Sequence, residues 1–384
     1  MPLSSGVSAP EYQAVRDLFE SFLLDDPQYS AQVAVYHSGV RVLQLSGGPR
    51  LAPDSITGAY SCSKGVAAFV IALLVQDGLL DLDRTVAHYW PEFAAHGKQG
   101  ITVRQALSHR AGLLGVEGGL ALSEFTTPDA ARKLAATAPQ WRPGATFGYH
   151  ALAIGIIMEE LCRRVAGTTL QQLYASRIRL PFGIDFFLGL PEEEEPRYLD
   201  VLYTADPRQD WLDPLGLEGL NGNAAVSTVM ELPNHRIVRE LGMSSAGGVG
   251  SAEGLARVYA AATTGVDGEP AFLAPETARI MSEEQVWGLD RSSGLDNAFA
   301  VIFMKPHPSR NFGSHRAFGH EGANGALGFA DPAYDLAFGY IPGTQEEGRT
   351  PGRAHRLAQA ARQAAASRPR PAPAGRSGAA RTYP

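Results

Sequence analysis

Ser61 and Lys64 lie three residues apart in the segment Tyr60-Ser61-Cys62-Ser63-Lys64-Gly65. At the start of a helix this spacing puts both side chains on one face, where the first-turn N–H groups stabilise an alkoxide or an acyl oxyanion. Such a serine acts as a nucleophile if the lysine takes its proton. Since a free lysine has a pKa of about 10.4, burial must lower it by several units. Alone, Ser-x-x-Lys also fits an N-cap serine followed by a solvated lysine.

The residues after this tetrad favour the catalytic interpretation. Val66 to Val75 reads V-A-A-F-V-I-A-L-L-V, and the helical pattern runs from Ser63 to about Asp77, with Gly78 as its C-cap. A helix that is apolar on most faces is buried, so its first turn lies in the interior, at a cleft. The sequence therefore predicts a buried lysine beside Ser61.

Ser61 to Asp83 resembles the nucleophile helix of the serine β-lactamase and DD-peptidase superfamily, whose penicillin-recognising members carry Ser-x-x-Lys. Ile101 to Leu113 resembles the segment after that helix, and we interpret His109 within it as structural. The most similar members are the family VIII carboxylesterases, relatives of the class C β-lactamases. The resemblance covers residues 11–366 and implies an acyl-enzyme mechanism on Ser61.

In these relatives a Tyr-x-Asn motif supplies the catalytic tyrosine, and here Tyr149 matches it while Ala151 replaces the asparagine. The resemblance implies that the nearby lysine favours the Tyr149 phenolate, which takes the serine proton. The alternative is a core tyrosine at a helix start. His150 either faces the cleft as part of the substrate site or merely precedes the helix.

Phe318 to Gly325 resembles the strand that carries Lys-Thr-Gly in β-lactamases, with His320-Glu321-Gly322 in its place. The family pattern implies an oxyanion hole formed by the N–H groups of Ser61 and Ala323. Gly322 lets a substrate approach the backbone closely. His320 is expected to donate to a substrate carbonyl or carboxylate, or else to be a structural histidine on an edge strand.

These departures bear on the substrate. In β-lactamases, the asparagine and the lysine that are absent here contact the amide and the carboxylate of the antibiotic. Their loss argues against efficient penicillin binding. Ester cleavage needs less help for the leaving group, which favours an esterase. The chain has no Gly-x-Ser-x-Gly elbow and no His-Glu-x-x-His zinc motif. We interpret Ser245 to Gly250 as a turn at the cleft, not as a phosphate loop.

The order of the elements that must position these residues indicates a strand domain interrupted by a helical one. The resemblance implies an α+β fold of the β-lactamase/DD-peptidase type, with an antiparallel sheet flanked by helices and an inserted all-helical domain. We expect residues 1–85 and 222–366 to form the sheet domain, 86–221 the helical domain, and 367–384 a disordered tail. The expected helices are 11–24, 63–77, 151–165, 252–262 and 353–366. The expected strands are 31–35, 40–45, 299–304, 326–330 and 336–341.

Composition excludes several classes of function. The 384 residues carry a net charge of -7 and no dominant basic patch, which argues against a nucleic-acid partner. Two cysteines do not make a disulfide framework, and neither a signal peptide nor a membrane-spanning stretch is evident. The run Glu192 to Glu195 is interpreted as a solvated loop. We expect a cytoplasmic protein without a cofactor or metal.

The leading hypothesis is a carboxylesterase-like serine hydrolase, with Ser61 as nucleophile and Lys64 and Tyr149 as proton-transfer groups. Its partner would be a small-molecule ester or acyl substrate. An acyltransferase, transesterase or peptide cyclase uses the same acyl-enzyme, and the sequence does not separate these from a hydrolase. A β-lactamase and a non-catalytic binding protein are less favoured, and the oligomeric state stays open.

Overall fold

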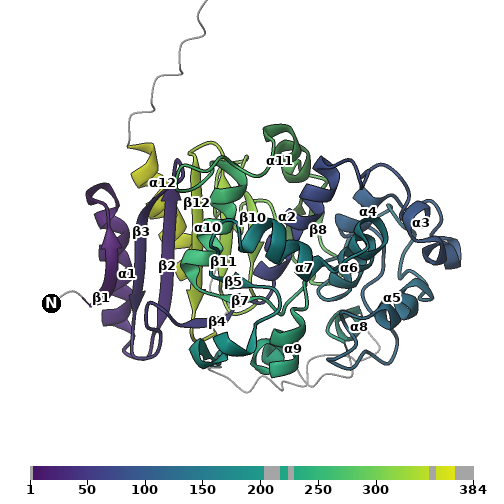
Figure 1. Cartoon of the computed structure of the whole chain (residues 1–384), viewed down its shortest axis with the longest axis horizontal. Helices are drawn as coiled ribbons and strands as arrows, with labels where there is room; N and C mark the ends of the chain where they lie inside the picture. The colour runs from purple at the N-terminus through teal and green to yellow at the C-terminus, as the bar shows by residue number, and fades with distance from the viewer. Residues whose placement is uncertain (1–2, 203–216, 224–228, 346–351, 368–384) are drawn as a thin grey trace, which may run out of the picture.

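The computed structural model describes residues 3–202, 217–223, 229–345 and 352–367. Its centre is a six-stranded antiparallel sheet in the order β1-β3-β2-β12-β11-β10 (Figure 1). These strands are β1 (Ser4–Ser8), β2 (Ala31–His37), β3 (Val40–Gly47), β10 (Phe318–Glu321), β11 (Leu327–Asp331) and β12 (Leu336–Pro342). Because β2 pairs with β12, the two ends of the chain build one sheet.

The β2–β3 hairpin follows from alternating side chains and a two-residue turn. Ser38 and Gly39 take positive φ angles of 51° and 76°, as tight hairpin turns require. Val33 and Val35 pack on one face of the sheet, while Ala34 packs on the other. Strand β2 is thus buried on both faces of the sheet.

Helices from distant parts of the chain cover the two faces. Helices α1 (Gln13–Asp25) and α12 (Arg353–Ala366) pack together on one face. The other face is covered by α2 (Cys62–Gln76) and α10 (Ala252–Thr263), which is capped by Ser251 as the sequence predicts. The predictions of a helix at each of these places are confirmed, and so is the antiparallel sheet flanked by helices.

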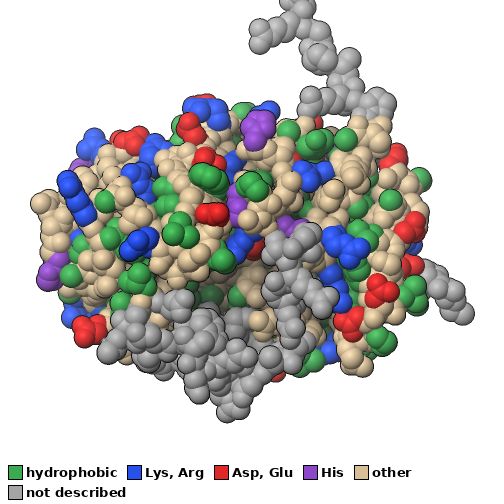
Figure 2. Space-filling view, turned by 180° about the vertical axis from the view of Figure 1, so that it is seen from behind, with side chains coloured by type: hydrophobic (Ala, Val, Ile, Leu, Met, Phe, Trp, Pro, Cys, Tyr) green, Lys and Arg blue, Asp and Glu red, His purple; other side chains and the backbone are tan. Residues whose placement is uncertain are grey.

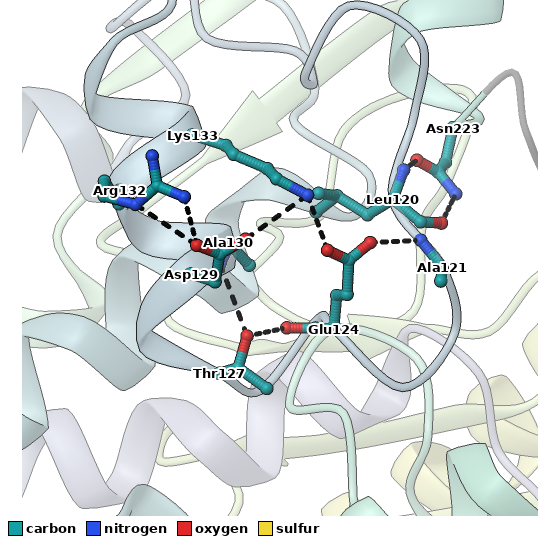
Figure 3. Close-up of polar contacts among 9 residues, drawn as sticks. All are labelled: Leu120, Ala121, Glu124, Thr127, Asp129, Ala130, Arg132, Lys133 and Asn223. Atoms are coloured by element: carbon teal, nitrogen blue, oxygen red, sulfur yellow. Dashed lines mark hydrogen bonds and ion pairs between the residues drawn. The ribbon is translucent and has the colours of Figure 1, made fainter.

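A group of helices lies beside this sandwich, at the right of Figure 1. In it, Lys133 of α5 bridges Glu124 and Asp129, and Asn223 pairs with both backbone groups of Leu120 (Figure 3). The remaining α-helices are α3 (Val86–Tyr89), α4 (Val103–Leu107), α5 (Pro128–Ala135), α6 (Ala153–Ala166), α7 (Leu170–Tyr174), α8 (Leu217–Asn221), α9 (Arg236–Leu241) and α11 (Pro275–Ser282). Short 3₁₀ helices span Pro10–Tyr12, Pro91–Gly97, Glu192–Arg197 and Val229–Asn234, and a π-helical turn spans Ala175–Arg179.

Two smaller sheets complete the fold. The first has the order β5-β7-β4-β6, and the second is the hairpin β8-β9. Their strands are β4 (Ile56–Gly58), β5 (Phe186–Phe187), β6 (Tyr198–Leu199), β7 (Val249–Gly250), β8 (Val286–Leu289) and β9 (Asp296–Phe299). Since β5 and β6 fall within 86–221, that segment is not wholly helical. The domain boundaries themselves stay a prediction.

Two expectations about single elements are wrong. The strand expected at 299–304 ends at Phe299, because the chain turns through Ile302, whose φ is 70°. The acidic run is a 3₁₀ helix, in which Glu194 binds Arg197 and Glu195 binds Arg239. Strand β1 was not foreseen. The tail expected at 367–384 lies outside the described residues beyond position 367.

The surface mixes both signs of charge on the face drawn in Figure 2. Cys62 and Cys162 are buried free thiols. Among the described residues, no helix is long and apolar enough to cross a membrane.

Candidate active site

Ser61 is the N-cap residue of α2 and lines a cavity of about 340 Å³. The residue before it, Tyr60, has a φ of 47°, a left-handed backbone that a bulky side chain rarely adopts. Such strain persists where the surroundings enforce it. Here the N–H of Ala59 donates to Gly248 and that of Cys62 donates to Ala59, which holds the turn on both sides.

Ser63 has a different environment from Ser61. It is fully buried, its hydroxyl donates to the Tyr60 carbonyl, and it accepts the N–H of Gly248 at 2.8 Å. Ser63 therefore fastens the glycine-rich loop to the helix start. It is not among the cavity-lining residues, whereas Ser61 is.

Lys64 lies beneath Ser61 and is fully buried. Its Nζ is 2.9 Å from Ser61 Oγ and donates to the Ser245 carbonyl at 2.7 Å. Burial holds the pKa of the Lys64 ammonium well below its usual range. The environment thus favours the neutral amine, which has a lone pair for the serine proton.

Tyr149 lies a few residues before α6 and contacts Ser61. Its Oη donates to Ser61 Oγ at 2.8 Å, and its ring stacks on Phe299 with the centroids 5.7 Å apart. Lys64 Nζ is 5.0 Å from the same ring. Burial raises the pKa of the Tyr149 phenol, which outweighs its hydrogen bond with Ser61. The expected phenolate is therefore disfavoured, because a buried neutral amine beside it supplies no compensating charge.

Asp290 positions Tyr149 and was missed in the sequence. The fully buried carboxylate accepts the Tyr149 N–H at 2.9 Å, and it also accepts the N–H and the hydroxyl of Ser292. It stands where the β8–β9 hairpin turns, some 140 residues after the tyrosine. No local motif marks it, because only the fold brings the two segments together.

Two buried histidines lie beside Tyr149 in the fold, and both bind backbone groups. His150 accepts the Leu113 N–H through Nε2, and its Nδ1 is 2.6 Å from the Gly148 carbonyl. Both ring nitrogens are thus engaged by the backbone, and His150 does not line the cavity. The substrate role proposed for it is not supported. His109 accepts the His150 N–H, and its ring lies 5.1 Å from that of Tyr149.

His320 lies in the cavity wall on β10 and is almost fully buried. Its Nδ1 is 2.8 Å from the Glu321 carbonyl, so Nδ1 carries the proton and donates it there. Burial, aided by the nearby Lys64, lowers the pKa of His320 to about 3. The neutral ring therefore presents a lone pair at Nε2. The expectation that His320 donates to a substrate is wrong for this tautomer.

Gly322 and Ala323 follow His320 in a tight turn that also lines the cavity. The Gly322 N–H donates to Ala326, and a Cβ at Gly322 would stand 2.5 Å from the Ala59 carbonyl oxygen. Any larger residue would push this turn away from the Ser61 segment. Among the hydrogen bonds of the described residues, none uses the N–H of Ser61 or of Ala323.

Comparison with known proteins agrees with this geometry. Residues 15–363 match the family model described as Beta-lactamase. The chain belongs to the Beta-lactamase family. The structure of EstA from Arthrobacter nitroguajacolicus Rue61a is 56% identical, with a TM-score of 0.92 over 94% of this chain and 98% of that one.

Two further relatives of this Beta-lactamase family member are esterases by name. The structure of a family VIII carboxylesterase is 30% identical, with a TM-score of 0.81 over 94% of this chain and 99% of that one. Esterase/beta-lactamase LipL from Mycobacterium tuberculosis (strain ATCC 25618 / H37Rv) is 27% identical over 378 residues, which cover 88% of this chain and 82% of LipL. The protein is thus an enzyme, a serine hydrolase of the Beta-lactamase family.

The cavity of this Beta-lactamase family enzyme has a charged wall that the sequence did not reveal. Arg310 lines it and lies 3.4 Å from Glu321, whose other oxygen is 2.9 Å from His355 Nε2. Burial opposes ionisation of Glu321, but its bond with His355 and the charge of Arg310 hold its pKa below the usual value. The Arg310 guanidinium in the cavity wall is therefore already paired with a carboxylate of the protein.

The backbone of Ala151, which stands where the asparagine of Tyr-x-Asn would be, is bound by an asparagine from a distant segment. Asn221, at the end of α8, accepts the Ala151 N–H at 2.6 Å through its side-chain oxygen.

No group of three His, Cys, Asp or Glu side chains within the described ranges is arranged to hold a metal ion.

Proposed function

We propose that this enzyme is a carboxylesterase that forms an acyl-enzyme on Ser61. The observation that carries the proposal is the convergence of two proton-handling groups on one cavity-lining hydroxyl. Lys64 Nζ and Tyr149 Oη lie 2.9 and 2.8 Å from Ser61 Oγ. These distances meet the requirement for direct proton transfer.

The neutral Lys64 amine takes the Ser61 proton as Oγ attacks the ester carbonyl. The N–H groups of Ser61 and Ala323 stabilise the oxyanion, each by about 3 kcal/mol. When the ester C–O bond breaks, the Tyr149 phenol gives its proton to the leaving alkoxide. Water then attacks the acyl-enzyme and gives one proton to the Tyr149 phenolate. The Lys64 ammonium returns its proton to Ser61 Oγ as the ester bond to the serine breaks and the carboxylic acid is released.

An ester fits this cavity better than a β-lactam does. A β-lactam carboxylate needs a fixed cation, but His320 is neutral with a lone pair at Nε2, and Arg310 is paired with Glu321. A charge-assisted hydrogen bond contributes about 1.5 to 3 kcal/mol, so its loss weakens binding by about one to two decades. Alkyl esters need no such partner.

The nucleophile is tested by fluorophosphonate labelling and mass spectrometry of the intact protein and its peptides. We expect one adduct per chain on Ser61 and none in Ser61→Ala. The matched control is Ser63→Ala, which should still be labelled because Ser63 does not line the cavity. Stoichiometric labelling of Ser61→Ala would remove Ser61 from the mechanism.

The substrate class is tested by comparing p-nitrophenyl butyrate with nitrocefin at pH 7 and pH 6. We expect kcat/KM for the ester to exceed that for nitrocefin by tenfold or more. The ratio should be the same at both values, because the pKa of His320 is about 3 and its charge does not change there. Faster hydrolysis of nitrocefin at both values would favour a β-lactamase.

A further inference from the structure

Asn297 lines the cavity and holds a hydrogen-bond acceptor that no group of the described residues satisfies. The side chain is 3% exposed, and its amide nitrogen donates to Asp290 Oδ2 at 2.8 Å. This bond fixes the orientation of the amide, since a carboxylate oxygen accepts. The other end, Oδ1, is buried and has no partner among the described residues.

His320 holds a second acceptor of the same kind in the same cavity. Its Nδ1–H is committed to the Glu321 carbonyl, so Nε2 is a lone pair. Nε2 is buried and has no partner within the described part of the chain. Buried polar groups are nearly always paired in native proteins, and an unpaired one calls for a specific explanation.

Both acceptors lie on the Tyr149 side of the site. The His320 ring is 5.9 Å from the Tyr149 ring, and Asn297 binds the same Asp290 carboxylate that holds the Tyr149 backbone. In the proposed reaction Tyr149 protonates the leaving alkoxide. The groups around it therefore contact the alcohol half of the ester and not its acyl chain.

Two unpaired acceptors favour a substrate group that carries hydrogen-bond donors. A carboxylate has none, and a plain alkyl group leaves both lone pairs unsatisfied, which is costly in a buried site. We propose that the enzyme acts on esters of polyhydric alcohols, whose free hydroxyls donate to His320 Nε2 and Asn297 Oδ1. This inference rests on the proposed esterase function and names the alcohol half of its substrate.

The test uses two esters that differ only in those hydroxyls. Glyceryl 1-monobutyrate is propyl butyrate with two added hydroxyl groups, and both release butyric acid that a pH-stat measures. One hydrogen bond to an otherwise unpaired buried acceptor contributes about a factor of ten. We expect the wild-type enzyme to have at least a tenfold higher kcat/KM for the glyceryl ester. A ratio of one or below would overturn the proposal.

Two variants assign the effect to the named atoms. His320→Leu and Asn297→Leu should each lower the ratio of the two kcat/KM values about tenfold, whereas His320→Gln, which keeps an acceptor, should retain part of it. Both esters are measured on one preparation, so the ratio does not depend on the folded fraction. A ratio unchanged in both leucine variants would overturn the assignment. If neither variant is active, the wild-type ratio alone decides whether the proposal stands.

The result also separates this inference from the function on which it rests. Turnover of both esters that disappears in Ser61→Ala, combined with no preference for the glyceryl ester, would leave the esterase intact and end this proposal. If neither ester were turned over, both proposals would be overturned.

Discussion

At the scale of single residues, burial acts on Lys64 and Tyr149 toward the neutral form of each. It lowers the pKa of the lysine and raises that of the tyrosine. A neutral amine and a neutral phenol on either side of Ser61 make a base and an acid, whereas a cationic lysine beside a phenolate would make two charges in a poorly solvated site. In the proposed mechanism the proton of the serine moves to Lys64, and the leaving alkoxide receives the proton of Tyr149.

This assignment predicts how Tyr149→Phe depends on the leaving group. The variant loses the proton donor but keeps the ring that stacks on Phe299. We expect kcat/KM, which reports acylation, to fall about 10²- to 10⁴-fold for an ethyl ester. For a p-nitrophenyl ester the loss should be much smaller, because p-nitrophenolate leaves without a proton. Equal losses on both esters would instead make Tyr149 the base that activates Ser61.

At the scale of elements, helix α6 connects the tyrosine segment to the loop that anchors Lys64. Glu159 on this helix is buried and accepts the Ser244 N–H at 3.0 Å, next to the Ser245 carbonyl that binds Lys64. Its second oxygen has no partner among the described residues. Burial raises the pKa of Glu159 from 4.5 to about 7, although its hydrogen bonds with Ser244 oppose this.

We expect Glu159 to make the free energy of unfolding depend on pH. The folded state binds this proton more tightly than the unfolded chain, so the free energy of unfolding falls as pH rises from 4.5 to about 7. The contribution is about 3 kcal/mol at most. Glu159→Gln should therefore be more stable than wild type at pH 8 and show less change between pH 5 and pH 8 in urea denaturation.

The control for this experiment is Glu160→Gln, one residue further along α6. Glu160 is also buried, but it pairs with Arg163 and Arg164 and not with the Ser244 segment. It should keep the pH dependence of wild type. If Glu159→Gln kept that dependence as well, the buried carboxyl would not be its source.

At the scale of the whole molecule, both ends of the chain form one sheet, and α10 packs directly on it. Gly339 of β12 makes this close approach possible, because a Cβ there would lie 2.2 Å from the Ala252 carbonyl oxygen. Backbone faces backbone at this point, so no side chain can move aside. The packing of α10 on β12 thus holds together segments that are nearly ninety positions apart.

Gly339→Ala should therefore destabilise the fold. Relieving the clash requires α10 to shift from the sheet, and overpacking of this kind costs about 1 to 3 kcal/mol. The matched control is Gly100→Ala, where a Cβ would meet nothing within 4 Å. Thermal unfolding should give a lower Tm for Gly339→Ala alone. Equal Tm values for both variants would show that the helix adjusts without cost.

Features that depend on neighbours in the chain were predictable from the sequence. The Ser61–Lys64 spacing, the apolar helix behind it and the Ser38-Gly39 turn reflect helical and strand periodicity, which local residues determine. The family resemblance extended this to Tyr149 and to the turn after His320. Strand β1 and the end of β9 were not recoverable in this way, because pairing with distant strands decides them.

Only the tertiary structure decided the protonation and direction of the site groups. Burial of Lys64 and Tyr149 depends on what packs around them, and the His320 tautomer depends on the orientation of one carbonyl. His150 is adjacent to Tyr149 in sequence, yet its ring binds the backbone instead of facing the cavity. Asp290 is distant in sequence, yet it accepts the N–H of Tyr149. A sequence specifies which groups exist, but solvation and hydrogen-bond geometry arise only when distant segments meet.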